Sequence, residues 1–139
     1  MIILDTNVLS ALMREQPERK IIDWLDAQPA ASIWITAITI MEIRFGLHVL
    51  LKGRRRDALI RSFDLLLRDV IEGRVAPFDA EAGMRAAELM ANLKRIGRPV
   101  EVRDTMIAGI ALANRATLAT RNTKHFEDSS ITLIDPWNS

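Results

Sequence analysis

The sequence predicts an α/β fold in which helices cover both faces of a central parallel sheet of four or five strands. Short apolar segments at residues 1–4, 33–36, 117–120 and 131–134, with a fifth candidate at 75–78, have the composition of buried strands. Helical patterns separate them, and this alternation is typical of a doubly wound parallel sheet. With 139 residues, 49% of them hydrophobic, the chain has the size and composition of one domain, expected to span residues 1–139.

In the first half of the chain, helices are expected to about residue 13 and over 18–27, 38–51 and 57–69. Asp5, Thr6 and Asn7 follow the first strand, and all three are favourable residues for a helix N-cap. Gly53 separates the third predicted helix from the fourth.

In the second half, Pro77 confines the 75–78 strand to a strand end or a sheet edge. Asp79 is expected to cap a long helix that stops at Gly97. Asp104 is expected to open an apolar helix that reaches about Asn114.

The composition limits the chemistry. The absence of cysteine excludes disulfides, thiol catalysis and cysteine-bound zinc, and it suits a reducing cytoplasm. With only two histidines, any metal is expected to be a hard, oxygen-bound cation such as Mg²⁺ or Mn²⁺. No signal peptide or membrane helix is expected. The net charge of +1 does not indicate nucleic-acid binding, although residues 52–56 form a basic run, either a solvated helix start or a phosphate-contacting patch.

Ligands of doubly wound sheets bind beyond the carboxyl ends of the strands, near the point where the strand order reverses. The segments 5–7 and 120–122 follow the first and the fourth of the five candidate strands, so the site is expected there.

Three acids stand out. On a helix, Glu42 falls among Ile38, Phe45 and Val49, where a carboxylate is costly without a cation or hydrogen bonds; the alternatives are an arginine partner and a metal. Asp104 begins a stretch of nine uncharged residues and could be a plain N-cap. Asp5 could likewise be only a cap.

These acids share a possible chemistry. Neighbouring carboxylates repel unless a divalent cation neutralises them. A cation bound in this way can activate a water molecule and stabilise phosphate charge, so the three acids indicate phosphodiester hydrolysis.

Four ordered segments, at residues 3–9, 39–46, 104–108 and 119–122, resemble the motifs of PIN domains, above all VapC-type toxins of the FitB-like subgroup. The resemblance implies a three-layer α/β/α domain and a cytoplasmic endoribonuclease that hydrolyses RNA with a metal-activated water. It also implies a type II toxin, a homodimer, a VapB-type antitoxin, and contact with operator DNA only through that antitoxin.

Carried over residue by residue, the resemblance makes Asp5, Glu42 and Asp104 the ligands of Mg²⁺ or Mn²⁺. Thr120 and Asn122 complete the catalytic set, with Thr6 and Asn7 supporting the first acid. The family often has Asp at the position of Asn122. Because an amide brings no charge, one firmly held cation and a second, conditional one are expected.

Two rival interpretations remain. The chain could be a catalytically weak PIN domain that binds RNA or an antitoxin. A receiver domain or haloacid-dehalogenase-type phosphatase fits poorly, because a single acid follows the first strand. Trp24, Trp34 and the basic run at 52–56 are unranked candidates for RNA contact. The apolar helix at 38–51 is expected to contribute to a subunit or antitoxin interface.

Overall fold

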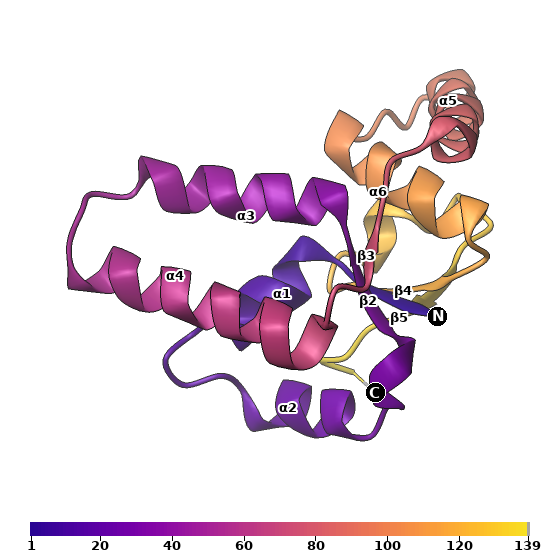
Figure 1. The fold of residues 1–139 in the computed structure, drawn as a ribbon. Helices are drawn as coiled ribbons and strands as arrows, with labels where there is room; N and C mark the ends of the chain where they lie inside the picture. The colour runs from indigo at the N-terminus through magenta and orange to yellow at the C-terminus, as the bar shows by residue number, and fades with distance from the viewer. Residues whose placement is uncertain (139) are drawn as a thin grey trace.

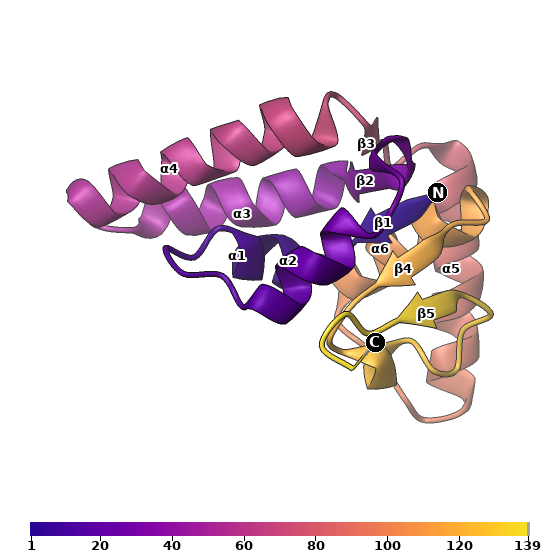
Figure 2. The ribbon, with the colours of Figure 1, turned by 90° about the horizontal axis from the view of Figure 1, so that it is seen from below.

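The computed structural model describes residues 1–138; Ser139, the last residue of the expected domain, lies outside the described residues. Five parallel strands form one sheet in the order β3-β2-β1-β4-β5, flanked by six α-helices (Figures 1 and 2). The predicted α/β class is confirmed, with five strands rather than four. The strands are β1 (Ile2–Leu4), β2 (Ile33–Thr36), β3 (Val75–Ala76), β4 (Thr117–Ala119) and β5 (Thr132–Ile134).

The helices agree closely with the predicted segments. Their bounds are α1 (Thr6–Leu12), α2 (Arg19–Asp26), α3 (Ala37–Val49), α4 (Arg54–Leu66), α5 (Ala80–Arg95) and α6 (Val102–Ala113). A π-helical turn, Leu67–Ile71, continues α4, and short 3-10 turns occupy Ala30–Ser32 and Thr123–His125. None of the helices among residues 1–138 is long and apolar enough to cross a membrane.

Two helix starts differ from the prediction. Helix α4 begins at Arg54, three residues before the expected start, so the three arginines of the basic run lie in its first turn. Helix α6 begins at Val102, because the Thr105 N–H donates to the Glu101 carbonyl and closes a turn before the expected start. Asp104 is therefore the third residue of α6 and not its opening cap.

Alternate residues of the strands pack on opposite faces of the sheet, as expected for strands buried on both sides. Ile3 and Leu118 belong to a core with α5 and α6, whereas Leu4 and Ala119 belong to a second core with α1, α2 and α4. Helix α3 contributes to both cores and then runs with α4 away from the sheet as a hairpin (Figures 1 and 2).

The sheet order places the site. The chain runs outward from β1 through β2 to β3, then returns to the other side of β1 for β4 and β5. Strand order thus reverses between β1 and β4, with β3 at the edge, as Pro77 predicted. The segments after β1 and β4 are neighbours at the carboxyl edge of the sheet.

Candidate active site at the carboxyl edge of the sheet

Asp5 lies at the point where β1 meets β4. Its backbone N–H donates to the Ala119 carbonyl at 2.9 Å, and only 4% of the residue is exposed. The Thr6 N–H donates to Asp5 Oδ1 at 2.8 Å, and the Thr120 hydroxyl donates to Oδ2 at 2.7 Å. Asn7 Nδ2 lies 3.4 Å from both Asp5 Oδ2 and Thr120 Oγ1. Three neighbours therefore fix the orientation of this buried carboxylate.

Glu42 reaches the same edge from α3. The Thr6 hydroxyl donates to Glu42 Oε1 at 2.9 Å and lies equally far from the Thr39 hydroxyl. Arg103 Nη1 lies 3.7 Å from Glu42 Oε2, so the expected alternative of an arginine partner is also present. The Glu42 side chain is 19% exposed and thus remains open to a ligand.

Asp104 approaches from the first turn of α6. Its Oδ2 lies 3.0 Å from Nδ1 of His125, which belongs to the 3-10 turn after β4. A carboxylate in the first turn of a helix is favoured by the helix dipole. Its side chain is 22% exposed, comparable to that of Glu42.

The charges of the other two carboxylates act on Asp5. Burial raises the pKa of Asp5 above its usual value; hydrogen bonds from Thr120 and Thr6 oppose this, and the charges of Asp104 and Glu42 add to it. The acids thus share one electrostatic environment, in which a bound cation would favour the ionised form.

The side chains as oriented do not form a ready-made metal cage. Among residues 1–138, no three Asp, Glu or His side chains are grouped closely enough to hold one ion. Glu42 and Asp104 instead contact Arg103 and His125. The donors are nevertheless oxygen atoms of the kind that Mg²⁺ and Mn²⁺ prefer. Their assignment as metal ligands stays a prediction.

Asn122 takes part through its backbone. Its N–H donates to Thr120 Oγ1 at 3.1 Å, while its exposed side-chain amide makes no hydrogen bond within residues 1–138. Asp79 contrasts with the three acids, since its side chain accepts from the Ala82 N–H at 3.0 Å and caps α5, as predicted.

Sequence reasoning missed three contributors: Thr39, Arg103 and His125. Thr39 and Arg103 each lie three residues or fewer from a motif acid, so helix geometry could have placed them nearby. His125 carries no such signal, because its position depends on the 3-10 turn at Thr123–His125.

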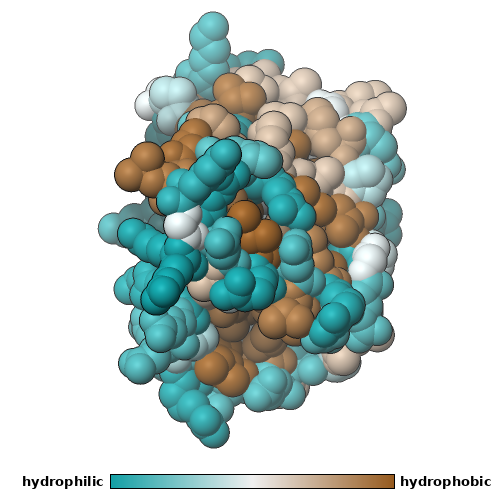
Figure 3. Space-filling model, turned by 60° about the vertical axis from the view of Figure 1, so that its left-hand side comes forward, coloured by the Kyte–Doolittle hydropathy of each residue, from teal (hydrophilic) through white to brown (hydrophobic). Residues whose placement is uncertain are grey.

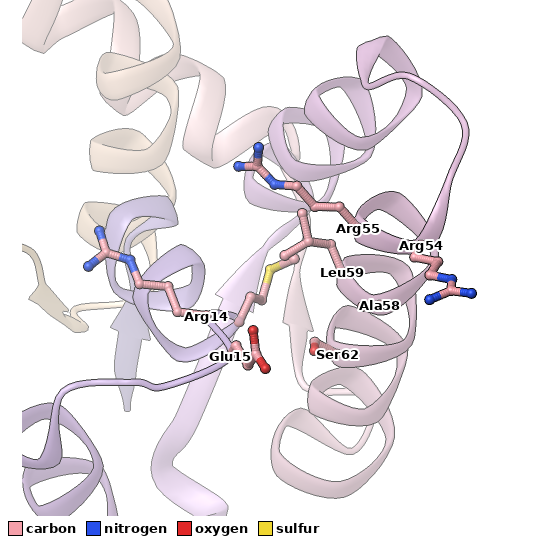
Figure 4. A pocket seen from close by; sticks show the side chains of 8 residues that line it. Arg14, Glu15, Arg54, Arg55, Ala58, Leu59 and Ser62 are labelled. Atoms are coloured by element: carbon pink, nitrogen blue, oxygen red, sulfur yellow. The ribbon is translucent and has the colours of Figure 1, made fainter.

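The candidates for RNA contact differ in burial and in orientation. Trp24 and Trp34 are partly buried against the two hydrophobic cores. The start of α4 lines a cavity of about 760 Å³ between α4 and residues 13–15 (Figure 4). There the guanidinium groups of Arg14 and Arg55 extend toward the same side but lie apart, and that of Arg54 points the opposite way, so the three do not converge on one phosphate (Figure 4).

The expected surroundings of Glu42 need a correction. Phe45 and Val49, predicted to share a buried apolar side with Glu42, are 63% and 64% exposed. Helix α3 runs beyond the sheet, so its last turns have no layer above them (Figure 1). Figure 3, with the α3–α4 side turned forward, shows apolar side chains among hydrophilic ones.

Comparison with known proteins agrees with this fold. A family model described as PIN domain matches residues 2–129. A VapC ribonuclease of Sinorhizobium fredii, Y4jK, is 39% identical, covering 99% of this chain and 98% of that protein. The crystal structure of FitAcB from Neisseria gonorrhoeae superimposes with a TM-score of 0.90 at 32% identity, covering 100% of both chains. VapBC2 from Rickettsia felis, bound to a promoter DNA fragment, gives a TM-score of 0.83 at 26% identity, covering 96% of this chain and 98% of that one. The chain therefore belongs to the PIN-domain family, alongside its VapC- and FitB-type members.

Proposed function

We propose that this chain is an endoribonuclease dependent on Mg²⁺ or Mn²⁺ and acts in the cytoplasm as the toxin of a type II toxin–antitoxin module. The observation that carries the proposal is the environment of Asp5. This carboxylate is buried, and its pKa is raised by burial and by the charges of Glu42 and Asp104. Relatives named as VapC ribonucleases supply the expectation that the substrate is RNA.

Asp5, Glu42 and Asp104 would hold the cation, exchanging the present contacts of Glu42 with Arg103 and of Asp104 with His125 for it. When bound, the cation neutralises the carboxylates, lowers the pKa of a coordinated water and stabilises charge on the scissile phosphate. With an uncharged amide at Asn122, three carboxylates favour one firmly held cation.

The surrounding residues keep the acids in place. Thr120 and the Thr6 N–H hold the two oxygens of the Asp5 carboxylate, and the Thr6 hydroxyl spans the gap to Glu42. Asn7 links Asp5 to the segment after β4. Its Oδ1 accepts from the Arg121 N–H at 3.3 Å, and its Nδ2 lies 3.4 Å from Asp5 Oδ2. This network fixes the first acid before any ligand arrives, which reduces the cost of ordering the site.

We also propose that the chain forms a homodimer and is inhibited by a VapB-type antitoxin, through which alone it would meet operator DNA. Exposed apolar side chains on α3 support a protein partner, because charged or polar residues would be expected on a free helix face. The promoter DNA in the VapBC2 structure is consistent with the indirect contact.

The test is cleavage of a mixture of cellular RNAs by the purified chain with Mn²⁺ or with EDTA. Asp5→Asn is expected to abolish cleavage and to remove any rise in melting temperature that Mn²⁺ produces. Asp79→Asn is the matched control, because it alters an acid that caps a helix away from the site. Cleavage that survives Asp5→Asn, or that persists in EDTA, would refute the assignment.

The second candidate function is a PIN domain that binds RNA or an antitoxin without efficient cleavage. The observation in its favour is the lack, among the described residues, of three acids already grouped for one ion. RNA binding without Mn²⁺-dependent cleavage would favour this alternative.

A further inference from the structure

Two cavities flank the three acids, and they differ in chemistry. The one beside Glu42 measures about 270 Å³ and is lined mainly by apolar residues at and near α3 and α4. Thr6 and Ser10 of α1 also line it, and Glu42 is its one charged residue within residues 1–138. The one beside Asp104 measures about 420 Å³ and lies between residues 97–101 and the 124–125 pair. Both contact the site, so the choice between them decides on which side a polyanionic substrate can extend.

The Asp104 cavity is lined by charged side chains of both signs. Arg98, Lys124 and His125 line it together with Glu101 and Asp104. Glu101 is paired with Arg103 at 2.7 Å, and Asp104 is one of the proposed cation ligands. Arg98 is already neutralised, with Nη1 2.8 Å from Glu127 and a second ion pair with Asp128. Lys124, by contrast, has no acidic partner within residues 1–138. An unpaired ammonium group at a cavity is available to a phosphate, whereas no basic side chain of residues 1–138 lines the Glu42 cavity.

Ion pairs hold the walls of this cavity in register. Arg98 belongs to the 97–101 wall, and its partners Glu127 and Asp128 come shortly after the 124–125 wall in the sequence. Arg98 Nη2 also donates to the Lys124 carbonyl at 3.4 Å. His125 also lines the cavity, with half of its side chain exposed. Its ring is an aromatic surface of the kind on which RNA bases stack, and Pro99 and Val100 add apolar surface to the same cavity.

We propose that this cavity binds the nucleotide next to the scissile phosphate of a single-stranded RNA, with Lys124 contacting the backbone phosphate and the His125–Pro99–Val100 surface receiving the base. The volume lies within the range of roughly 300–1,000 Å³ typical of small-ligand sites. This inference rests on the proposed ribonuclease function for its substrate class, and it adds the direction in which the strand leaves the acids.

The test measures fluorescence anisotropy of a labelled 12-nucleotide single-stranded RNA of randomised sequence, in EDTA so that cleavage does not interfere. Lys124→Ala is expected to weaken binding by roughly three- to tenfold and to reduce the slope of log K against log salt by about 0.7, as loss of one phosphate contact predicts. Lys124→Arg should restore both quantities. Lys20→Ala, an exposed lysine on α2, is the matched control and should leave both unchanged.

With Mn²⁺ present, Lys124→Ala should raise KM for RNA cleavage while kcat changes little, and the Mn²⁺-induced rise in melting temperature should persist. Binding by Lys124→Ala with the wild-type affinity and salt slope would overturn the proposal, as would equal weakening in Lys20→Ala. Asp5-dependent cleavage with Lys124→Ala behaving as wild type would leave the function standing and refute the subsite. Lys124-dependent binding without any cleavage would refute the function and keep the subsite.

Discussion

The two helix pairs that border the site are packed to different degrees. Helices α5 and α6 approach so closely that a Cβ on Gly109 would lie 2.5 Å from the Ala82 carbonyl oxygen and 2.8 Å from Ala86 Cβ. Helices α3 and α4 touch at few places, and a Cβ on Gly46 would have no neighbour within 4 Å among residues 1–138. Both pairs have exposed apolar side chains, but only α5 and α6 are packed so closely that an added methyl group has no room between them.

The difference bears on the site, because the acids come from both sides. Asp104 stands on the tightly packed α6, Glu42 stands on α3, and Asp5 lies between them at the end of β1. Helix α6, which carries Asp104, is tightly packed, whereas α3, which carries Glu42, is incompletely covered. A partner that binds to α3 would therefore contact the helix that carries one of the acids. Glu42 would then be the acid through which a bound antitoxin could affect catalysis.

Gly109→Ala should have the largest effect on stability. The added methyl group meets backbone at 2.5 Å, which must push α5 and α6 apart. Overpacking of this kind costs about 3 kcal/mol, and the roughly 1 kcal/mol by which alanine exceeds glycine in a helix offsets only part of it. Urea unfolding should therefore show a loss of about 2 kcal/mol. An unchanged unfolding midpoint would show that the two helices separate easily.

How much of this contrast the sequence reveals depends on the element. The Asp5–Thr120 neighbourhood follows from strand order, because the carboxyl ends of β1 and β4 must be adjacent once the order reverses there. The exposure of Phe45 does not follow, since helical periodicity marks an apolar side without showing how far the sheet extends beneath it. The His125–Asp104 contact is equally hidden, because an irregular turn has no period to read.

Asp5 lies between the two helix pairs. Asp5→Asn should raise the free energy of unfolding, by a smaller amount than Gly109→Ala lowers it. Burial raises the pKa of Asp5, so the folded chain binds more protons than the unfolded chain between their two pKa values, and stability falls as pH rises through that window. Asparagine does not titrate. In EDTA, the gain of Asp5→Asn over the wild type should therefore grow from about pH 4 upward and level off above the folded pKa. Urea unfolding at several pH values measures it; a gain independent of pH would contradict the argument.

Gly46→Ala is the counterpart of Gly109→Ala on the open side. It places the same methyl group in the interior of α3, where nothing lies within 4 Å. Alanine should therefore raise the free energy of unfolding by up to about 1 kcal/mol through helix propensity alone. Opposite signs for the two substitutions would establish the packing contrast by measurement, whereas a loss of stability in Gly46→Ala would mean that α3 and α4 pack more tightly than the structure indicates.

Phe45→Asp should have the smallest effect on the folded chain and the most informative one on its assembly. The side chain is 63% exposed, so the free energy of unfolding of the isolated chain should change by no more than about 0.5 kcal/mol. Light scattering should nevertheless show lost self-association, because a carboxylate buried in an interface without a partner is costly. Ile96→Asp, at the exposed end of α5, is the matched control and should keep the wild-type mass. A wild-type chain that stays monomeric at high concentration, or a Phe45→Asp variant that still dimerises, would show that α3 is not a subunit interface. The exposed side of α3 would then be a site for the antitoxin alone. Loss of antitoxin co-purification in Phe45→Asp would test that assignment.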